Sequence, residues 1–290
     1  MTASLPYWEP ISPDDGFIDL HLHTIHSDGR YTPQSLVAAA ARKGLRAIAV
    51  TDHDTVSGIR ETADFAAKAG IELLPGIEIS TMTEEYGELH LLGYGIDPNH
   101  AGLRCALEHQ KQMRLRRIEQ VLERLSELGI LISMETLLRQ AGFSNSPGRP
   151  HIARAMIEAG YVASFEDAFH RYLGKGKPAF LAKTSMSHQQ AIEIIAQSGG
   201  IPILAHPGLA RKDNVIPALI DMGLRGLEVF HSEHAPEDAR RYTEMVTTYG
   251  LLATGGSDCH GGKDDALPLI GTVAVPYALF SRLQACCAVR

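Results

Sequence analysis

Cysteine is scarce in this sequence of 290 residues, which contains only four thiols. Cys105, Cys259, Cys286 and Cys287 show no Cys-x-x-Cys spacing, and the adjacent pair 286–287 is poorly placed to cross-link itself. This pattern argues against a disulfide framework. We therefore expect reduced thiols and assign them no chemistry.

Long apolar runs are also absent, since no segment reaches the roughly 18 uncharged residues that span a bilayer. Residues 1–16 are rich in proline and acid and lack the basic and apolar blocks of a secretory signal. We therefore expect no membrane segment and a cytoplasmic location. Because 44% of the residues are apolar, the chain can bury a sizeable core, as one large α/β domain or as a barrel carrying an insertion.

Positive charge is in the minority, with 27 Lys and Arg against 34 Asp and Glu and a formal net charge of −7. The distribution is uneven, because residues 101–180 contain 12 basic and 8 acidic side chains and the remainder contains 15 and 26. Taken alone, a modest basic segment is usually a solvated face. If the active site takes an anionic substrate, however, this basic segment is a candidate for binding it.

Short apolar segments alternate with amphipathic stretches, which is typical of βα units and predicts the α/β class. The first helix is marked by Thr32 as a cap, Pro33 at its first position and Gly44 at its end. Further helices are expected at residues 58–69, 187–198, 215–222, 236–249 and 277–287. The predicted strands are Phe17–Leu22, Ala47–Thr51, Glu72–Leu74 continuing into Ile77–Ile79, Leu89–Tyr94, Ile201–Ala205, Gly226–Phe230 and Leu251–Thr254.

The alternation stops between residues 97 and 180. A long helical pattern from about Leu103 to Leu128 is followed by a run of turn formers at 144–150, two shorter helices and a Gly-Lys-Gly-Lys-Pro loop at 174–178. We therefore predict a barrel formed by residues 1–100 and 181–290, with a helical insertion at 101–180 that serves as a substrate lid.

Histidines and carboxylates cluster where the predicted strands end. Strand residues two apart point to the same side, so a His-x-His pair can converge on one cation. In a parallel barrel the carboxyl ends of all strands open onto one rim, which is where function gathers. Seven strands that each deliver such side chains are hard to explain as packing. The residues are His21, His23, Asp52, His53, Asp54, Glu78, His90, His206, His231, Asp258 and His260.

Imidazoles mixed with carboxylates suit Mn²⁺, Zn²⁺ or Fe²⁺ better than Ca²⁺, and the ligand types alone do not decide among the three. Some nine ligands are too many for one ion, so we expect two or three divalent cations, with Mn²⁺ as the first choice. Glu78 is the expected bridging carboxylate. Asp19 and Asp52 are expected either to orient the neighbouring imidazoles or to be solvated strand ends.

Several blocks of sequence resemble the PHP (polymerase and histidinol phosphatase) family, and the resemblance covers the whole chain. The block order, the length and the insertion after His90 resemble in particular bacterial nucleoside 3′,5′-bisphosphate phosphatases, a subgroup that includes a 5′-to-3′ exoribonuclease. The blocks are Phe17-Ile-Asp-Leu-His-Leu-His-Thr, His26-Ser-Asp-Gly, Val50-Thr-Asp-His-Asp, Pro75-Gly-Ile-Glu-Ile-Ser, His90-Leu-Leu-Gly-Tyr, Ala205-His-Pro and Gly256-Ser-Asp-Cys-His.

The resemblance implies a distorted (β/α)₇ barrel and three sets of metal ligands. His21, His23, Glu78 and Asp258 fall on one metal; Glu78, His90 and His206 on a second; Asp28, His53 and His260 on a third. It implies hydrolysis of the 3′-phosphate of nucleoside 3′,5′-bisphosphates or of short RNA, by attack of a metal-activated hydroxide. Nucleotides or short oligoribonucleotides are then the expected partners, with no obligate protein partner.

Cationic side chains near the rim are candidates for holding the phosphate. Arg149 is the strongest, because a guanidinium binds phosphate bidentately and a helix N-terminus follows it. His231 and Arg149 are the expected catalytic groups, through stabilisation of transition-state charge. Substrate binding is assigned to Arg149, His151, Lys175, Lys177, Lys183 and His231.

Three other functions fit parts of the pattern. The chain could hydrolyse another small phosphomonoester such as histidinol phosphate, or act as an amidohydrolase on C–N bonds, since those barrels also place imidazoles and acids on a rim. It could also be a non-catalytic module that binds nucleic acid. Missing ligands would favour that last alternative, and none is missing.

Overall fold

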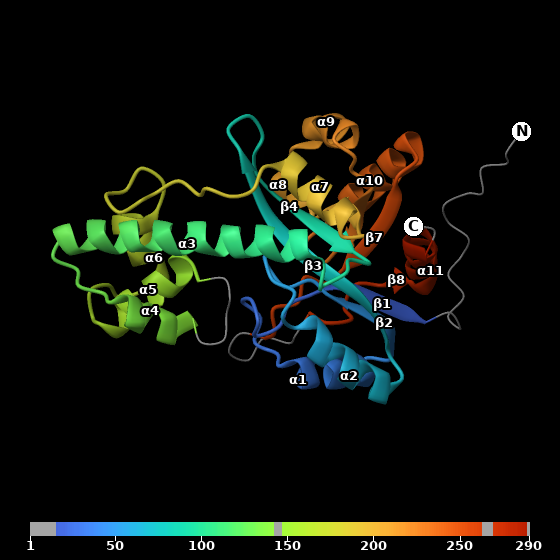
Figure 1. Ribbon diagram of the computed structural model, residues 1–290, viewed down its shortest axis with the longest axis horizontal. Helices are drawn as coiled ribbons and strands as arrows, with labels where there is room; N and C mark the ends of the chain where they lie inside the picture. The colour runs from blue at the N-terminus through green and yellow to red at the C-terminus, as the bar shows by residue number, and fades with distance from the viewer. Residues whose placement is uncertain (1–15, 142–146, 263–268, 289–290) are drawn as a thin grey trace, which may run out of the picture.

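The computed structural model describes residues 16–141, 147–262 and 269–288, so residues 144–146 of the predicted turn run lie outside the described part (Figure 1). Its centre is one eight-stranded sheet in the order β7-β6-β5-β4-β3-β2-β1-β8. All seven predicted strands are present, β3 is continuous, and a short β8 is added. The strands are β1 Phe17–Leu22, β2 Leu45–Val50, β3 Glu72–Thr83, β4 Gly87–Tyr94, β5 Ile201–Leu204, β6 Gly226–His231, β7 Leu252–Gly256 and β8 Val275–Pro276.

The sheet curls until its two ends nearly meet. Leu22 at the end of β1 forms a parallel bridge with Cys259, and the amide of His23 donates a 3.1 Å hydrogen bond to the Cys259 carbonyl. Gly256 permits this approach, because a Cβ atom there would lie 2.3 Å from the backbone nitrogen of His21. The predicted α/β barrel is confirmed as a nearly closed barrel.

One strand runs opposite to its two neighbours. β4 pairs antiparallel with both β3 and β5, whereas β1-β2-β3 and β5-β6-β7 are parallel. β4 is antiparallel because a tight connection joins β3 to β4 as a hairpin, which is one distortion of the predicted (β/α)₇ barrel. His90 pairs with Ser80, which places it diagonally opposite Glu78 on the same face of the hairpin.

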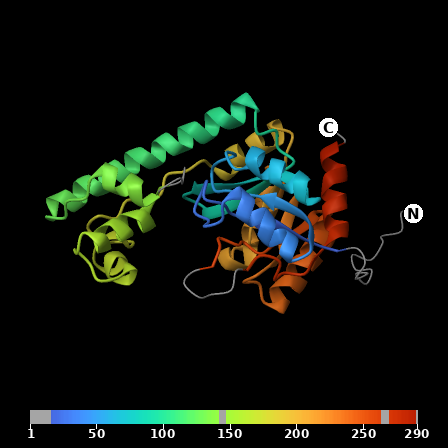
Figure 2. The same ribbon diagram turned by 90° about the horizontal axis from the view of Figure 1, so that it is seen from below.

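Helices cover the outside of the barrel (Figures 1 and 2). The first begins as predicted, since the hydroxyl of Thr32 accepts a 3.2 Å hydrogen bond from the amide of Ser35 and Pro33 follows. None of the helices in the described ranges is long and apolar enough to cross a membrane. The covering helices are α1 Pro33–Arg42, α2 Ile59–Ala69, α7 His188–Gln197, α8 Pro207–Ala210, α9 Ile216–Asp221, α10 Pro236–Tyr249 and α11 Tyr277–Ala288.

The described residues of the insertion, 101–141 and 147–180, extend away from the barrel along one long helix, α3 Ala101–Glu127 (Figure 2). Leu103 and Leu107 in its first half pack in the barrel core, whereas Ile118 and Leu125 in its second half belong to a separate apolar cluster. That cluster also holds the buried apolar residues of the shorter helices. They are α4 Met134–Ala141, α5 Arg149–Glu158, α6 Phe165–Ala168 and the π-helical turn Phe169–Leu173.

Candidate metal centre and active site

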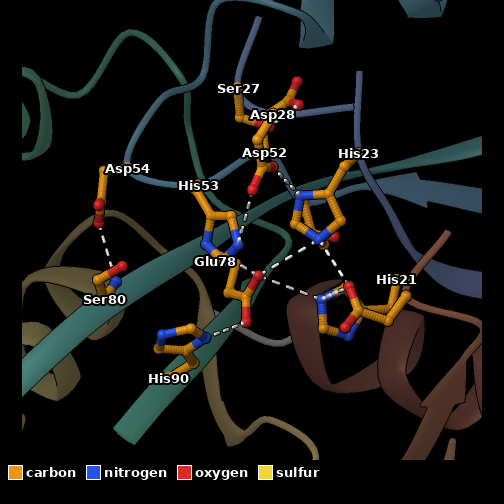
Figure 3. A network of polar contacts seen from close by, with 12 residues as sticks. His21, His23, Ser27, Asp28, Asp52, His53, Asp54, Glu78, Ser80 and His90 are labelled. Carbon is orange, nitrogen blue, oxygen red and sulfur yellow. Dashed lines mark hydrogen bonds and ion pairs between the residues drawn. The ribbon is translucent and has the colours of Figure 1, made fainter. Parts of the chain in front are cut away.

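Glu78, fully buried in β3, lies at the centre of the predicted ligand residues (Figure 3). This one carboxylate is surrounded by five imidazoles from four segments of the chain. Its Oε2 atom lies 3.3 Å from Nε2 of His21, 3.3 Å from Nε2 of His23 and 3.1 Å from Nδ1 of His53, and its Oε1 atom lies 2.9 Å from Nδ1 of His90 and 3.0 Å from Nε2 of His206.

Two further carboxylates flank this centre. Asp258 places Oδ1 3.0 Å from Nε2 of His23 and 3.4 Å from Nε2 of His21. Asp28 lies on the outer side, with Oδ1 3.2 Å from Nε2 of His260 and Oδ2 3.8 Å from Nε2 of His53. All nine residues predicted as ligands are thus brought together.

Ligand-type atoms within 4.8 Å of one another form groups that match the implied sets closely. His21, His23, Glu78 and Asp258 form one group with the predicted membership. The second group contains Glu78 and His90 as predicted, but its third member is His53, while His206 contacts Glu78 outside this group. The third group contains Asp28, His53 and His260 as predicted, together with His23. Sequence reasoning omitted a further group, His21, Glu228 and His231.

Several atoms in this centre are buried without a hydrogen-bond partner in the described residues: both ring nitrogens of His23, Nδ1 of His53, Nδ1 of His206 and Oδ1 of Asp258. Buried polar atoms in native proteins are nearly always satisfied. Divalent cations would satisfy these nitrogen and oxygen atoms, which are ligand types that Mn²⁺, Zn²⁺ and Fe²⁺ accept. The residues present therefore fit a metal cluster.

The backbone is strained where it delivers these side chains. His206 (φ 27°), Asp258 (φ 54°) and Asp54 (φ 54°), which follows His53, adopt positive φ angles although none is glycine. Such conformations cost on the order of 1–3 kcal/mol each and persist at functional sites where surrounding structure enforces them.

Burial and the neighbouring carboxylates shift the pKa values of the histidines in this centre. Burial lowers the pKa of His53 to about 4. Burial has the same tendency at His90 and His260, but the Glu78 carboxylate beside His90 and the Asp28 carboxylate beside His260 outweigh it, and both pKa values are raised to about 9. At neutral pH without metal, His53 is therefore neutral while His90 and His260 carry protons.

We expect loading with divalent cations to release protons, because a histidine must be neutral to bind a metal. With pKa values of about 9, His90 and His260 each lose a proton on metal binding at pH 7, and apparent affinity rises with pH up to about 9. Isothermal titration calorimetry in buffers of different ionisation enthalpy measures the release. A heat that does not depend on the buffer would contradict it.

Glu228 in β6 is a buried carboxylate that the sequence analysis missed. Its Oε1 atom lies 2.9 Å from Nδ1 of His21, and its Oε2 atom accepts a 2.7 Å hydrogen bond from the backbone amide of His206. A carboxylate on the far ring nitrogen fixes the orientation and tautomer of a metal-binding histidine. Glu228 therefore holds Nε2 of His21 toward Glu78 and Asp258.

Asp19 and Asp52 do not orient imidazoles, and neither is a solvated strand end. Buried Asp19 accepts from the amides of Ser257 (2.8 Å) and Gly271 (3.0 Å), with a weaker contact to the amide of His21 (3.4 Å). Buried Asp52 accepts from the amide and hydroxyl of Thr24 (both 2.7 Å) and from the hydroxyl of Ser27 (2.6 Å). Both carboxylates therefore fix the backbone at the rim. The chain turns sharply there, so these backbone amides have no partner in a strand or helix and donate to the carboxylates instead.

A cavity of about 770 Å³ joins the ligand residues to the insertion. Of the predicted substrate-binding residues, Arg149, His151 and Lys183 line it, and Lys183 also pairs with Glu88. Lys175 and Lys177 do not line it. His231 is buried behind the cavity, with Nε2 3.5 Å from Oδ2 of Asp258.

The cavity wall also includes α3 residues that sequence reasoning missed: Gln110, Arg114 and Arg117. Asp54 ties this helix to the barrel. Its Oδ1 atom accepts from the amide of Ser80 (2.9 Å, Figure 3) and from Nε2 of Gln110 (2.7 Å), and its Oδ2 atom pairs with Arg114. The only sequence signal was their placement in a helix that begins beside the rim.

Three known proteins that are similar over most of the chain are phosphoesterases. The 3′,5′-nucleoside bisphosphate phosphatase of Chromobacterium violaceum is 33% identical over 258 residues, which are 85% of this chain and 90% of that protein. The 5′-3′ exoribonuclease Rnm of Salmonella typhimurium is 34% identical over 249 residues, 83% and 84% of the two chains. The phosphoribosyl 1,2-cyclic phosphate 1,2-diphosphodiesterase of Eggerthella lenta is 30% identical over 255 residues, 87% and 97% of the two chains.

The family and the fold agree with these relatives. The crystal structure of an inferred metal-dependent phosphoesterase from Bifidobacterium adolescentis superposes with a TM-score of 0.80 at 31% identity, over 93% of this chain and 96% of that one. A family model described as the PHP domain matches residues 19–195. The chain therefore belongs to the PHP domain family and is a metal-dependent phosphoester hydrolase.

Proposed function

We propose that this enzyme removes the 3′-phosphate from nucleoside 3′,5′-bisphosphates and can also act on short RNA in the 5′-to-3′ direction. The supporting observation is the cavity of about 770 Å³, because metal-ligand residues line one part of it and cationic residues of the insertion line another. This volume falls in the usual range for sites that enclose a small organic ligand. A nucleotide with two phosphates can place one phosphate at the metal-ligand residues and the other at the cationic residues of the insertion.

We propose that the nine predicted ligands hold two or three cations, with Mn²⁺ as the first choice: His21, His23, Asp28, His53, Glu78, His90, His206, Asp258 and His260. When bound, the cations would lower the pKa of a coordinated water and would act as Lewis acids toward the phosphoryl oxygens. Glu228 keeps His21 in the binding tautomer, and Nε2 of His231 lies 3.5 Å from Oδ2 of Asp258. His231, expected to bind substrate and to act in catalysis, is buried and does not line the cavity, so in this proposal it positions Asp258 and does not itself touch substrate.

Arg149 is the proposed phosphate anchor of the lid. It is the first residue of α5, so the helix N-terminus adds favourable potential for an anion. Its guanidinium lies 5.8 Å from the ring centre of Phe169 and 5.5 Å from that of Phe180, and Nη1 donates to the carbonyl of Leu173 at 3.3 Å. These contacts hold it at the cavity wall before substrate arrives. His151 and Lys183 complete the proposed set; Lys175 and Lys177 remain predictions that no cavity contact supports.

We expect Arg149→Ala to lower kcat/KM for adenosine 3′,5′-bisphosphate by about 100-fold, because a charge-assisted hydrogen bond is worth up to about 3 kcal/mol. Arg171→Ala is the matched control, since Arg171 lies in the same insertion, pairs with Asp167 and does not line the cavity. Phosphate release at several substrate concentrations gives both constants. Equal efficiency of the Arg149 variant and the parent would show that the lid role is wrong.

One substrate panel tests the proposed activity as a whole. Elemental analysis of the purified protein gives metal identity and number, and phosphate release is then compared for adenosine 3′,5′-bisphosphate, histidinol phosphate and phosphoribosyl 1,2-cyclic phosphate. Mononucleotide release from a short RNA measures the exonuclease activity. We expect the bisphosphate to have the highest kcat/KM among the small esters. Preference for the cyclic ester, which the relative from Eggerthella lenta makes the second candidate, would overturn the proposal.

A further inference from the structure

The barrel contributes a cationic side chain of its own to the cavity wall. Arg30, Gly261 and Gly262 line the cavity and lie in the loops that contain or follow the ligand residues Asp28 and His260. The two loops are joined, because the amide of Arg30 donates a 2.8 Å hydrogen bond to the carbonyl of His260. An exposed arginine therefore lies in the cavity wall without belonging to the insertion.

Arg30 and the attachment of the insertion lie at different places around the ligand residues. The segment that returns from the insertion reaches the barrel beside His90, because Lys183 pairs with Glu88 and Nε2 of His90 lies 3.4 Å from the same carboxylate. Arg30 instead follows Asp28, and Figure 3 shows Asp28 and His90 on opposite sides of the ligand cluster. A chain-like substrate that crosses this cluster from the insertion can therefore reach Arg30.

The side chain of Arg30 is held by the loop that follows His260. Its Nη1 atom donates a 3.1 Å hydrogen bond to the carbonyl of Gly262. Gly261 lets the two loops approach, because its φ is 85° and a Cβ atom there would lie 3.0 Å from the Cβ atom of Arg30. No ion pair joins Arg30 to a carboxylate of the described residues, so its charge can act on a ligand.

The two proposed substrates differ beyond the reacting phosphate. In a nucleoside 3′,5′-bisphosphate this phosphate is one end of the molecule. When a 5′-mononucleotide is released from RNA, the same kind of bond breaks: a water oxygen bonds to phosphorus, and the 3′-oxygen leaves and takes up a proton. The phosphate then still carries the next nucleoside on its other ester oxygen. The remaining RNA must therefore extend away from the ligand residues, and its next phosphodiester is a further anion.

We propose that Arg30 binds this next phosphodiester, the one on the 3′ side of the cleaved bond. The inference deepens the proposed function and rests on it, because it assumes that the cleaved phosphate lies at the metal ligands. A guanidinium forms charge-assisted hydrogen bonds with phosphate oxygens, and such contacts position a nucleic-acid chain without reading its bases. Arg30 then favours RNA of three or more nucleotides, since a bisphosphate and a dinucleotide lack this phosphodiester.

Arg225 provides a matched control on the barrel. Both arginines are exposed. Arg225 directly precedes β6, whose other end carries His231, so it lies at the opposite end of the strand from the site and does not line the cavity. Its substitution removes one positive charge from the protein and none from the cavity.

The test compares Arg30→Gln and Arg225→Gln on adenosine 3′,5′-bisphosphate and on 5′-phosphorylated diadenylate and triadenylate. Initial release of phosphate or of the first mononucleotide is measured with metal-loaded protein. We expect Arg30→Gln to lower kcat/KM for triadenylate by about 10-fold and to change those for the other two substrates by less than about twofold. Arg225→Gln should change none of them. An equal loss on all three substrates, or no loss on triadenylate, would refute the assignment.

The salt dependence of triadenylate cleavage gives a readout that a purely structural defect would not move. Each phosphate contact to a single strand contributes about 0.7 to the slope of the logarithm of affinity against the logarithm of salt concentration. We expect the corresponding slope of kcat/KM to become shallower by about 0.7 in Arg30→Gln and to stay parental in Arg225→Gln. An unchanged slope in Arg30→Gln would contradict a phosphate contact.

The same measurements separate this inference from the proposed function. If the parent cleaves triadenylate but not the bisphosphate, and Arg30→Gln shows both changes, the proposed removal of the 3′-phosphate fails and the assignment of Arg30 stands. If the parent hydrolyses the bisphosphate but not triadenylate, the assignment of Arg30 fails alone. A metal-loaded parent that is inactive on all three substrates would reject both.

Discussion

Replacement of Glu78 by glutamine is expected to lower kcat/KM for phosphoester hydrolysis by at least about 1000-fold. Among the described residues only Glu78 is a carboxylate that contacts five imidazoles, so the variant loses the negative charge that the ligand sets share. Bound cations supply several kcal/mol of transition-state stabilisation, and about 4 kcal/mol corresponds to about 1000-fold in rate. Glutamine preserves the shape of the side chain, so the loss reports on charge.

Glu233→Gln is the matched control for Glu78→Gln. Glu233 lines the same cavity but is exposed and belongs to no group of ligand-type residues. Elemental analysis should find less metal in the Glu78 variant and parental metal content in the Glu233 variant, with circular dichroism showing that both are folded. Full activity with full metal content in Glu78→Gln would remove Glu78 from the centre of the proposed site.

The ligand residues were predictable because their signal is local. All but Asp28 follow or lie within an apolar strand, and the pairing of His21 with His23 is visible in the sequence alone. Asp28 was predicted only through the resemblance to the PHP family. The first helix was equally local, since Thr32 and Pro33 mark its start. What the pattern could not show was the direction of β4, because an antiparallel strand has the same alternation as a parallel one.

The missed residues depend on contacts that are distant in sequence. Glu228 lies in the apolar strand β6 and contacts His21, 207 residues earlier in the chain. Arg117 is one of several arginines along α3, and only the packing of the returning segment at Leu181 shows which of them lines the cavity. Asp19 and Asp52 were misjudged because the amides that they accept from are exposed by turns whose geometry the sequence does not reveal.

Replacement of Glu228 by glutamine is expected to weaken metal binding by about 10- to 100-fold, as is usual when a partner of a metal-binding histidine is altered. The carboxylate accepts from two donors, Nδ1–H of His21 and the amide of His206. Glutamine offers one carbonyl oxygen and turns a donating amino group toward the other donor. The imidazole of His21 or the turn at His206 must then shift, and either change displaces a proposed ligand. Excess Mn²⁺ should restore part of the activity.

A loss of stability alone would imitate part of this result, so the control must be a buried carboxylate that holds only backbone. Asp19 meets that condition, since it accepts from the amides of Ser257 and Gly271 and more weakly from that of His21, and no hydrogen bond or ion pair joins it to an imidazole of the described residues. We expect Asp19→Asn and Glu228→Gln each to cost about 1–3 kcal/mol in the free energy of unfolding. Only Glu228→Gln should raise the Kd for Mn²⁺ measured by calorimetry on the folded protein. If both variants bind Mn²⁺ like the parent, Glu228 stabilises the barrel and does not position His21 for the metal.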